Sequence, residues 1–472
     1  MQPTSHDFIA RARGGLADDN LQQALARFQT GFTVKRAEAA ARLPEFEALR
    51  DQAVEIKNHT LEHLDFYLER FADMVEESGG EVHWCVTPDE ARQTILDICR
   101  AAGAKTVTKS KSMIGEEIAL NPFLEKHDIE PIETDLGEYI VQIANEYPSH
   151  IIAPAVHKTK DQVADLFYEQ HKDQGGGKRL EEVDELVAEA RAMLRHRFIA
   201  ADVGITGANF LVAETGTTAI VTNEGNGDLT QILPRVHIVL ATLEKAVPTL
   251  DDMSTILRIL ARSATGQEFS TYTTLSTGPK RPGDLDGPEA FHVILLDNGR
   301  SRMLGSEFRE VLRCIKCGAC MNHCPVYGSI GGHAYGWVYP GPLGAVLTPN
   351  LVGLKEAHHL PNASTFCGRC EAVCPMRIPL PGLMRRWREK EFDAGLQPPR
   401  NRLGLTLWGW LARHPTSYRL TSALMIRFLC LLGARRGRIA RLPFAHGWTA
   451  GRDMPAPEGG SFHAQWRRRG DA

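Results

Sequence analysis

Residues 314–325 read CIKCGACMNHCP, and residues 367–375 read CGRCEAVCP. The first stretch has the residue spacing of a bacterial ferredoxin, in which three cysteines turn tightly around one iron–sulfur cluster. The fourth cysteine of such a run precedes a proline and typically ligates the other cluster of a pair. The sequence therefore predicts iron–sulfur clusters, and electron transfer is the first function that it supports.

Two other roles for these cysteines fit the sequence poorly. A disulfide framework is typical of short secreted chains, and no apolar signal segment follows the first residues, MQPTSHDFIARARGG. A zinc site usually pairs two CxxC or CxxH units, whereas a third cysteine at i+6 and a Cys-Pro ending are features of iron–sulfur sites. We therefore favour iron over zinc.

The second run is incomplete, because Ser364 stands where a full motif would have its first cysteine. If each Cys-Pro cysteine ligates the cluster of the opposite run, the sequence contains one complete four-cysteine site and one site with three cysteines. The fourth iron of the second site would be held by Ser364, held by another oxygen ligand, or absent, which would leave a three-iron cluster. The complete site comprises Cys314, Cys317, Cys320 and Cys374, and the three-cysteine site comprises Cys324, Cys367 and Cys370.

Composition places the chain among ordinary globular proteins. Its 472 residues are enough for two or three domains with a sizeable core, and 43% of them are hydrophobic. The net charge of −4 gives no reason to expect nucleic acid as a partner. No stretch is long and apolar enough to cross a bilayer, and the reduced thiols that clusters require fit a cytoplasmic location.

Hydrophobic periodicity divides the chain into four parts. Residues 1–80 read as helices, and residues 81–300 alternate between strands and helices, which predicts an α/β domain with a parallel sheet. Residues 301–392 form the cluster domain, and residues 393–472 form an arginine-rich tail with several tryptophans. For this tail we favour contact with a protein partner over RNA or a membrane surface.

Individual elements can be placed within the α/β part. Thr87, Pro88 and Glu90 predict a capped helix start after a strand. Thr215-Gly216 predicts a break between two strands in residues 210–223. The other predicted strands are residues 81–86, 105–110, 151–157, 237–242 and 291–297, and further helices are predicted at 160–171, 179–199 and 253–264.

The densest patch of glycines and hydroxyls in this domain spans residues 204–225. Glycines beside hydroxyls at a strand end let backbone N–H groups approach an anionic ligand, and Glu214 could serve as a base or nucleophile. An equally good interpretation makes these residues hairpin turns. If the patch is a site, Glu214 is its catalytic candidate, and its substrate-binding candidates are Asn209, Thr215, Gly216 and Thr217.

Lys109 and Lys111 form a second candidate, at the end of the strand that begins at residue 105. Carboxyl ends of parallel strands are where α/β domains place their sites, so these lysines would hold a carboxylate or phosphate, or simply solvate a loop. The chain has neither a G-x-G-x-x-G dinucleotide fingerprint nor a phosphate-binding loop. A nicotinamide dehydrogenase or a nucleoside triphosphatase therefore lacks support.

The whole chain resembles the bacterial lactate utilization protein B family, the iron–sulfur subunit of a three-protein system for L-lactate oxidation. The segments that carry the resemblance are VTKSKSM (107–113), GITGANFLVAETGT (204–217), CIKCGACMNHCPVY (314–327), IGGHAYGWVYPGPLGAVL (330–347) and STFCGRCEAVCPMRIP (364–379). The serine at position 364 is similar to what that family shows.

The resemblance implies properties that the residue spacing does not. It implies an α/β domain related to the sugar-isomerase and CoA-transferase sheet, and two [4Fe-4S] clusters. It also implies electron transfer during oxidation of L-lactate to pyruvate, growth on lactate, and lactate utilization proteins A and C as partners. It assigns no catalytic residue for lactate.

Two other functions compete with this electron-transfer role. One is a stand-alone transferase or isomerase whose clusters are structural, and the other is a scaffold for cluster assembly or a regulator without turnover. Two Cys-Pro endings favour paired clusters that relay electrons, because a structural role would need only one. We expect an oxidoreductase subunit that is not active alone.

Overall fold

The computed structural model describes residues 4–110, 112–172, 178–443, 445–458 and 460–470. A fully parallel six-stranded sheet lies within its N-terminal unit, residues 1–390. Every neighbouring pair of its strands is parallel, as the alternation of strands and helices predicted. In spatial order the strands are β1 (Glu81–Cys85), β10 (Ala290–Leu296), β7 (Val236–Thr242), β4 (Val203–Gly207), β2 (Thr106–Lys109) and β3 (Glu130–Glu133).

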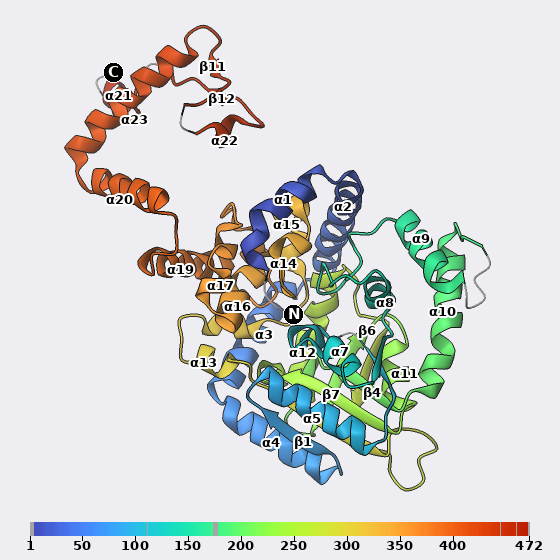
Figure 1. Ribbon diagram of the computed structural model, residues 1–472. Helices are drawn as coiled ribbons and strands as arrows, with labels where there is room; N and C mark the ends of the chain where they lie inside the picture. Colours follow the sequence, from blue (N-terminus) through green and yellow to red (C-terminus); the bar gives the residue numbers. More distant parts are fainter. Residues whose placement is uncertain (1–3, 111, 173–177, 444, 459, 471–472) are drawn as a thin grey trace. The chain divides into compact units, whose positions relative to one another are not determined.

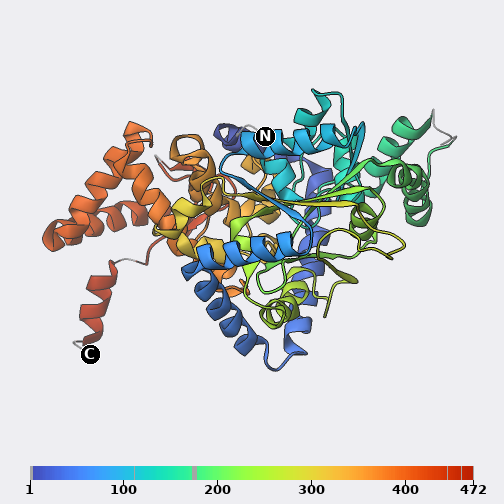
Figure 2. The same cartoon turned by 90° about the horizontal axis from the view of Figure 1, so that it is seen from below.

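Helices cover both faces of this sheet (Figures 1 and 2). Ile294 and Leu296 of β10 join the apolar cluster under one set of helices, and Val293 and Leu295 join the cluster on the opposite face. A strand that is buried on both faces has a nearly continuous apolar sequence, which is why residues 291–297 could be predicted as a strand. The helices of this domain are α5 (Pro88–Ala101), α6 (Met113–Glu117), α7 (Leu120–Glu125), α8 (Leu136–Ile143), α9 (Lys160–His171), α10 (Val183–Ala200), α11 (Asn226–Ile232) and α12 (Leu250–Ala264).

The start of α5 confirms the predicted capping box. Thr87 Oγ1 accepts a hydrogen bond from the backbone N–H of Glu90, and the Glu90 carboxylate accepts one from the backbone N–H of Thr87. The N-terminal residues are helical, as predicted. They form α1 (Phe8–Ala17), α2 (Asp19–Ala41), α3 (Phe46–Glu62) and α4 (Leu64–Glu77) after a short 3-10 turn.

A second, smaller sheet combines one parallel pair with two antiparallel pairs. The predicted break at Thr215-Gly216 is the turn between two of its strands. Gly216 has a φ of +65°, and a Cβ there would lie 2.5 Å from the backbone nitrogen of Val75, so this tight approach to α4 requires glycine. In spatial order the strands are β8 (Ala246–Val247), β5 (Phe210–Val212), β6 (Thr217–Thr222) and β9 (Tyr272–Ser276).

The strand predicted at residues 151–157 is wrong, because these residues form turns. His150 Nδ1 accepts hydrogen bonds from the backbone N–H groups of Ile152 and Ala153, at 3.1 and 3.2 Å. Pro154 has no N–H to donate to a sheet. The apolar residues of this segment pack against the cluster domain instead of pairing with a strand.

The cluster domain consists of short helices joined by irregular loops, with no strand among its described residues. It shares one apolar core with α3, α12 and one face of the large sheet. Its helices are α13 (Arg300–Leu304), α14 (Ala319–Asn322), α15 (Tyr327–Ile330), α16 (Gly341–Val352), α17 (Leu354–Ala357), α18 (Arg369–Ala372) and α19 (Leu380–Asp393).

Hydrogen bonds also join the cluster domain to the elements around it. The Arg50 guanidinium of α3 donates to the backbone oxygen of Cys374 at 2.6 Å. Asn322 Nδ2 donates to the backbone oxygen of Ala264 at 2.9 Å, and its Oδ1 bonds to His150 Nε2 at 2.9 Å. These contacts fix the cysteine loops against the α/β domain.

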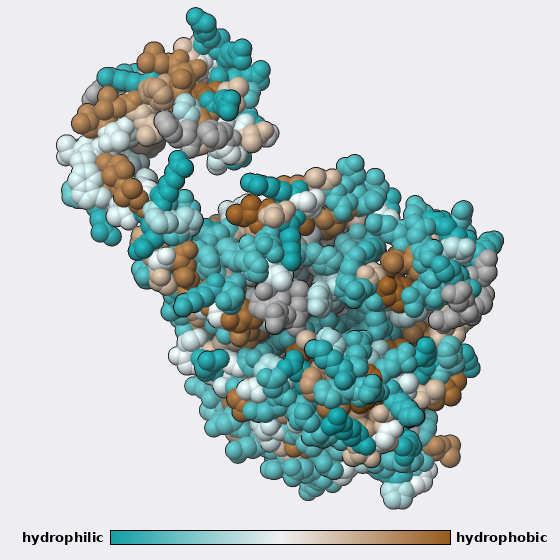
Figure 3. Space-filling model, in the orientation of Figure 1, coloured by the Kyte–Doolittle hydropathy of each residue, from teal (hydrophilic) through white to brown (hydrophobic). Residues whose placement is uncertain are grey.

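Contacts divide the chain into two units between residues 390 and 391. Residues 393–472 contain thirteen arginines and no lysine, against four acidic residues. Many large apolar side chains of the C-terminal unit are exposed, among them Leu403 and Trp408 of α20 and Leu431 of α21, as the brown surface of this unit in Figure 3 shows. Its elements are α20 (Pro399–Arg413), α21 (Pro415–Gly433), β11 (Arg438–Ile439), α22 (His446–Thr449), β12 (Met454–Pro455) and α23 (Phe462–Gly470).

None of the helices in the described part of the chain combines the length and the apolar character that crossing a bilayer requires.

Candidate iron–sulfur and ligand site

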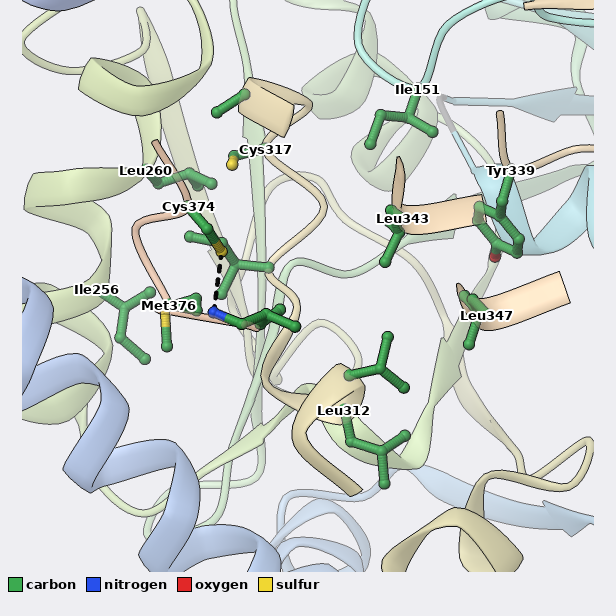
Figure 4. Packing of buried hydrophobic residues seen from close by; sticks show 14 of the residues in the cluster. Ile151, Ile256, Leu260, Leu312, Cys317, Tyr339, Leu343, Leu347, Cys374 and Met376 are labelled. Atoms are coloured by element: carbon green, nitrogen blue, oxygen red, sulfur yellow. Dashed lines mark hydrogen bonds between the residues drawn. The ribbon is translucent and has the colours of Figure 1, made fainter. Parts of the chain in front are cut away.

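One group of four cysteines lines a small apolar cavity in the cluster domain. Three of them come from the first run, and Cys374 comes from the second run. Figure 4 shows Cys317 and Cys374 on neighbouring loops, surrounded by apolar side chains. The members of this first thiol group are Cys314, Cys317, Cys320 and Cys374.

A second group lines a separate cavity, to which Cys324 comes from the first run. Cys367 is exposed at the protein surface, whereas Cys324 and Cys370 are buried. The two Cys-Pro cysteines therefore lie with the cysteines of the opposite run. The members of this second thiol group are Cys324, Cys367 and Cys370.

Backbone N–H groups point at the sulfur atoms of both groups. Lys316 N donates to Cys314 Sγ at 3.4 Å, Tyr327 N to Cys324 Sγ at 3.5 Å, and Ile378 N to Cys374 Sγ at 3.5 Å (the dashed line in Figure 4). Such donors stabilise thiolates and tune the potential of a bound cluster.

Ser364 lies in the second loop where Cys314 lies in the first. Phe366 N donates to Ser364 Oγ at 3.1 Å, just as Lys316 N donates to Cys314 Sγ. The loops also share their unusual backbone, since Lys316 and Phe366 have φ values of 58° and 53°. Ser364 is also among the residues that line the second cavity, which makes its hydroxyl a candidate for the missing ligand.

Burial raises the pKa of the thiols inside both groups. Burial, together with the neighbouring thiols, raises the pKa of Cys317 and that of Cys370 to about 12. Exposed Cys367 differs, because the backbone N–H of Arg369 lowers its pKa. Iron ions stabilise thiolates that are crowded in this way, so the donor set fits iron–sulfur clusters.

The two thiol groups lie close to each other. The pKa of Cys320, in the first group, is raised by burial, by the thiols of its own group and also by Cys370 of the second group. Cys320 and Cys370 therefore lie near enough to influence each other, and Cys367 of the second group is exposed.

A pocket of about 200 Å³ lies at the carboxyl ends of the parallel strands and reaches the first thiol group. Ser112 follows β2, Asn209 follows β4, and Lys245 follows β7, so three strands supply its floor. Cys317 lines both this pocket and the cavity of the first thiol group, and Lys316 lines the pocket beside it.

Among the substrate-binding candidates from the sequence, Asn209 lines this pocket. Its Oδ1 accepts a hydrogen bond from the backbone N–H of Val221 at 2.9 Å. Lys109 is 1% exposed and forms ion pairs with Glu116 at 3.0 Å and Glu133 at 2.6 Å. Lys111 lies outside the described residues.

Glu214, Thr215, Gly216 and Thr217 lie in and beside the β5–β6 turn and are not among the pocket-lining residues. Glu214 Oε1 accepts a hydrogen bond from the backbone N–H of Leu250 at 2.6 Å, the contact of a carboxylate that caps the start of α12. The catalytic role of Glu214 stays a prediction.

Sequence reasoning missed a buried charge network beside the pocket. The Arg300 guanidinium pairs with Glu117 at 2.8 Å and with Glu244 at 3.1 Å. Tyr339 Oη donates to Glu117 at 2.6 Å, and Lys316 Nζ lies 4.1 Å from the centre of the Tyr339 ring. The sequence offered one signal for this region: neighbouring Lys245 lies just beyond the end of a strand, where α/β domains place their sites.

Burial and, to a smaller extent, Lys316 lower the pKa of Lys245 to about 8, although Glu244 acts in the opposite direction. Burial raises the pKa of Glu244, but Arg300 and the lysines outweigh it and bring that pKa to about 2. At neutral pH, Lys245 is therefore mostly a cation and Glu244 is an anion.

Comparisons with known proteins agree with this arrangement of domains and thiols. Family models match residues 68–296 as a LUD domain, residues 310–378 as a 4Fe-4S dicluster domain, and residues 390–471 as the C-terminal region of lactate utilisation protein B. The dicluster match confirms iron–sulfur clusters as the cofactors. The fold and the thiols thus define an α/β protein that binds iron–sulfur clusters.

Curated relatives match along nearly the whole chain. Lactate utilization protein B of Bacillus licheniformis is 42% identical, over 98% of this chain and 96% of the relative. The proteins of that name from Shouchella clausii and Bacillus subtilis are 43% and 42% identical, over 98% and 96% of this chain and 97% and 95% of the relatives. The chain belongs to the lactate utilization protein B family.

Among solved structures, a DUF162 family protein from Deinococcus radiodurans aligns with 49% of this chain and 98% of its own. Its sequence identity is 15% and its TM-score is 0.26, which supports no argument about the fold. The predicted likeness to sugar isomerases and CoA transferases stays a prediction.

The crossing of the Cys-Pro cysteines can be tested by removing them singly. Because Cys324 lies with Cys367 and Cys370, Cys324→Ala should damage that cluster and leave the first one assembled. Cys317→Ala should have the opposite effect, and Cys430→Ala, outside both runs, should change neither. Iron analysis and electron paramagnetic resonance (EPR) of the anaerobic proteins would measure this. Loss of the first cluster in Cys324→Ala would show that the crossing is wrong.

The position of Ser364 predicts that its hydroxyl ligates the fourth iron of the second cluster. Ser364→Ala should then convert this cluster to a three-iron form with a new EPR signal in the oxidised state. Ser364→Cys, which restores the full motif, should keep four irons and lack that signal. An unchanged spectrum in Ser364→Ala would remove Ser364 as a ligand.

Proposed function

We propose that this chain is the iron–sulfur electron-transfer subunit of a multi-protein system that oxidises L-lactate to pyruvate and allows growth on lactate. Its relatives at about 42% identity carry the name Lactate utilization protein B. The 4Fe-4S dicluster match to residues 310–378 supports the electron-transfer part of this proposal.

One observation carries the proposal: the pocket at the strand ends adjoins the first thiol group, and the second thiol group lies near the first. Cys317 lines both the pocket and the first cavity, and Cys320 is influenced by Cys370 of the second group. Exposed Cys367 ends this series of one pocket and two thiol groups at the surface. This series leads from a place where a small molecule can bind to a surface where another protein can bind.

The overall reaction fixes what the protein must handle. L-lactate becomes pyruvate with the release of two electrons and two protons, so a base and an electron acceptor are both needed. Iron–sulfur clusters bound at these thiols supply one-electron transfer. The chain itself offers a pocket for the reactant beside the first thiol group and keeps the two thiol groups close together.

We propose lactate utilization proteins A and C as the partners. The chain has no dinucleotide fingerprint, so the group that first takes the electrons from lactate would come from a partner or a bound cofactor. Exposed Cys367 and the arginines near it offer a docking face. Arg388 and Arg385 lie over the ring of Phe366, at 4.1 and 5.9 Å.

A stand-alone transferase or isomerase with structural clusters is the alternative. The contact between the pocket and the first thiol group favours the redox function, because acid–base chemistry gains nothing from a wall made by a cluster ligand. A structural role would also need only one thiol group.

Partner dependence tests the proposed function. Anaerobic protein, purified alone and together with proteins A and C, is given L-lactate and a redox dye. We expect dye reduction by the complex and none by the chain alone. The Cys317→Ala complex, which lacks a complete first thiol group, should lose at least about 90% of the rate because the series is interrupted.

Two results would contradict the proposal. The first is rapid lactate oxidation by the isolated, flavin-free chain. The second is full dye reduction by a Cys317→Ala complex whose first cluster is missing, because the clusters would then be structural.

A further inference from the structure

Two ammonium groups mark one end of the strand-end pocket. Lys245 comes from the 3-10 turn after β7, and Lys316 comes from the first cysteine loop. Lys245 is 7% exposed, and Lys316 is half-buried over the Tyr339 ring. Both lysines line the same pocket, and Lys316 is among the charged groups that influence Lys245.

Two carboxylates beside the lysines, Glu117 and Glu244, already pair with another cation. Asp135 and Glu224 also line the pocket, so its wall carries negative as well as positive groups. Glu117 accepts two hydrogen bonds from the Arg300 guanidinium, at 2.9 and 2.8 Å, and Glu244 pairs with the same guanidinium. Among the residues that the structure describes, no carboxylate lies within ion-pair distance of Lys245 or Lys316. Glu244 is the strongest charged influence on Lys245 but also pairs with Arg300, so the two lysines can still attract a bound anion.

Several of the other polar side chains on the pocket wall are held by bonds within the protein. Ser112 Oγ accepts a hydrogen bond from Gly115 N at 3.2 Å, and Asp135 Oδ1 accepts one from Gly137 N at 2.9 Å. Thr265 Oγ1 donates to the Gln267 side chain at 2.6 Å. The lysines are therefore the groups best able to orient a ligand.

Pocket size restricts the ligand further. A volume of about 200 Å³ lies below the range of about 300–1,000 Å³ that is typical for drug-sized ligands. It favours a molecule of a few heavy atoms over a dinucleotide or a flavin. Apolar side chains, among them Ile151, Ile220 and Leu260, line the rest of the wall and suit a short hydrocarbon part.

We propose that Lys245 and Lys316 bind the carboxylate of a small 2-hydroxy or 2-oxo acid in this pocket, an inference that rests on the proposed function. Both lysines hold the acid against the wall formed by Cys317, at the first thiol group. They act as binding and positioning residues, and the oxidation itself needs neither of them as an acid or base.

Calorimetric titration of the unmodified, cluster-loaded chain with L-lactate, L-lactamide and oxamate tests the proposal without any electron transfer. Lactamide has the shape of lactate without its charge. We expect lactate and oxamate to bind at least about tenfold more tightly than lactamide, because a charged hydrogen bond is lost in lactamide. Equal affinities for lactate and lactamide, or no binding of either acid, would overturn the proposal.

Variants locate the site. Lys245→Gln and Lys316→Gln should each raise the Kd for oxamate at least about tenfold, and Lys245→Arg, which keeps the charge, should restore much of the affinity. Exposed Lys126→Gln is the matched control and should bind normally. Iron content and visible absorbance of each variant show whether its clusters are assembled.

The outcomes separate this inference from the proposed function. Unchanged oxamate binding in both glutamine variants, with a shifted cluster potential, would mean that the lysines only balance the charge of the thiolates and would overturn the site. Lysine-dependent binding together with a complex that does not oxidise lactate would instead overturn the proposed function and leave the site standing.

Discussion

The cluster domain depends on holding thiols from two separate loops at one point. Cys374 must reach Cys314, Cys317 and Cys320, while Cys324 must reach the second loop. Short helices and irregular loops supply little regular hydrogen bonding, and metal–thiolate bonds would add folding free energy to that of the shared apolar core. The buried thiols, whose pKa values are raised, are costly to ionise until iron compensates them.

The position of the cysteine loops also determines where the α/β domain can bind a ligand. Its sheet places a pocket at the strand ends, as parallel sheets generally do, and the first cysteine loop closes that pocket. Arg50 and Asn322 anchor the loops to surrounding helices, and one apolar core runs through both domains. A small acid bound at Lys245 and Lys316 would thus lie beside the thiols without any movement of domains.

The sequence predicted the elements that have strong local signals. Thr87 and Glu90 specified a helix start, the apolar run of β10 specified a strand buried on both faces, and the cysteine spacing specified the cofactor. The strand predicted at residues 151–157 was wrong, because an apolar run that contains a proline resembles a strand until its tertiary contacts are known.

The pocket was harder to predict, because it joins residues that are far apart in sequence. Glu214 was conspicuous in the sequence because glycines and threonines surround it. In the structure, Gly216 forms a turn against α4, and Glu214 caps the start of α12. Lys316 could not be recognised within a cysteine motif, and Lys245 had only its place after a strand. A local pattern shows where the chain turns, whereas a binding site depends on which turns come together.

The most direct test of this account is EPR spectroscopy of the chemically reduced, anaerobic chain, together with its iron content. Two neighbouring thiol groups predict about seven to eight iron atoms per chain and two cluster signals broadened by magnetic interaction with each other. A chain with two zinc ions and no visible chromophore, or with two clusters whose signals are fully independent, would contradict a path from pocket to surface.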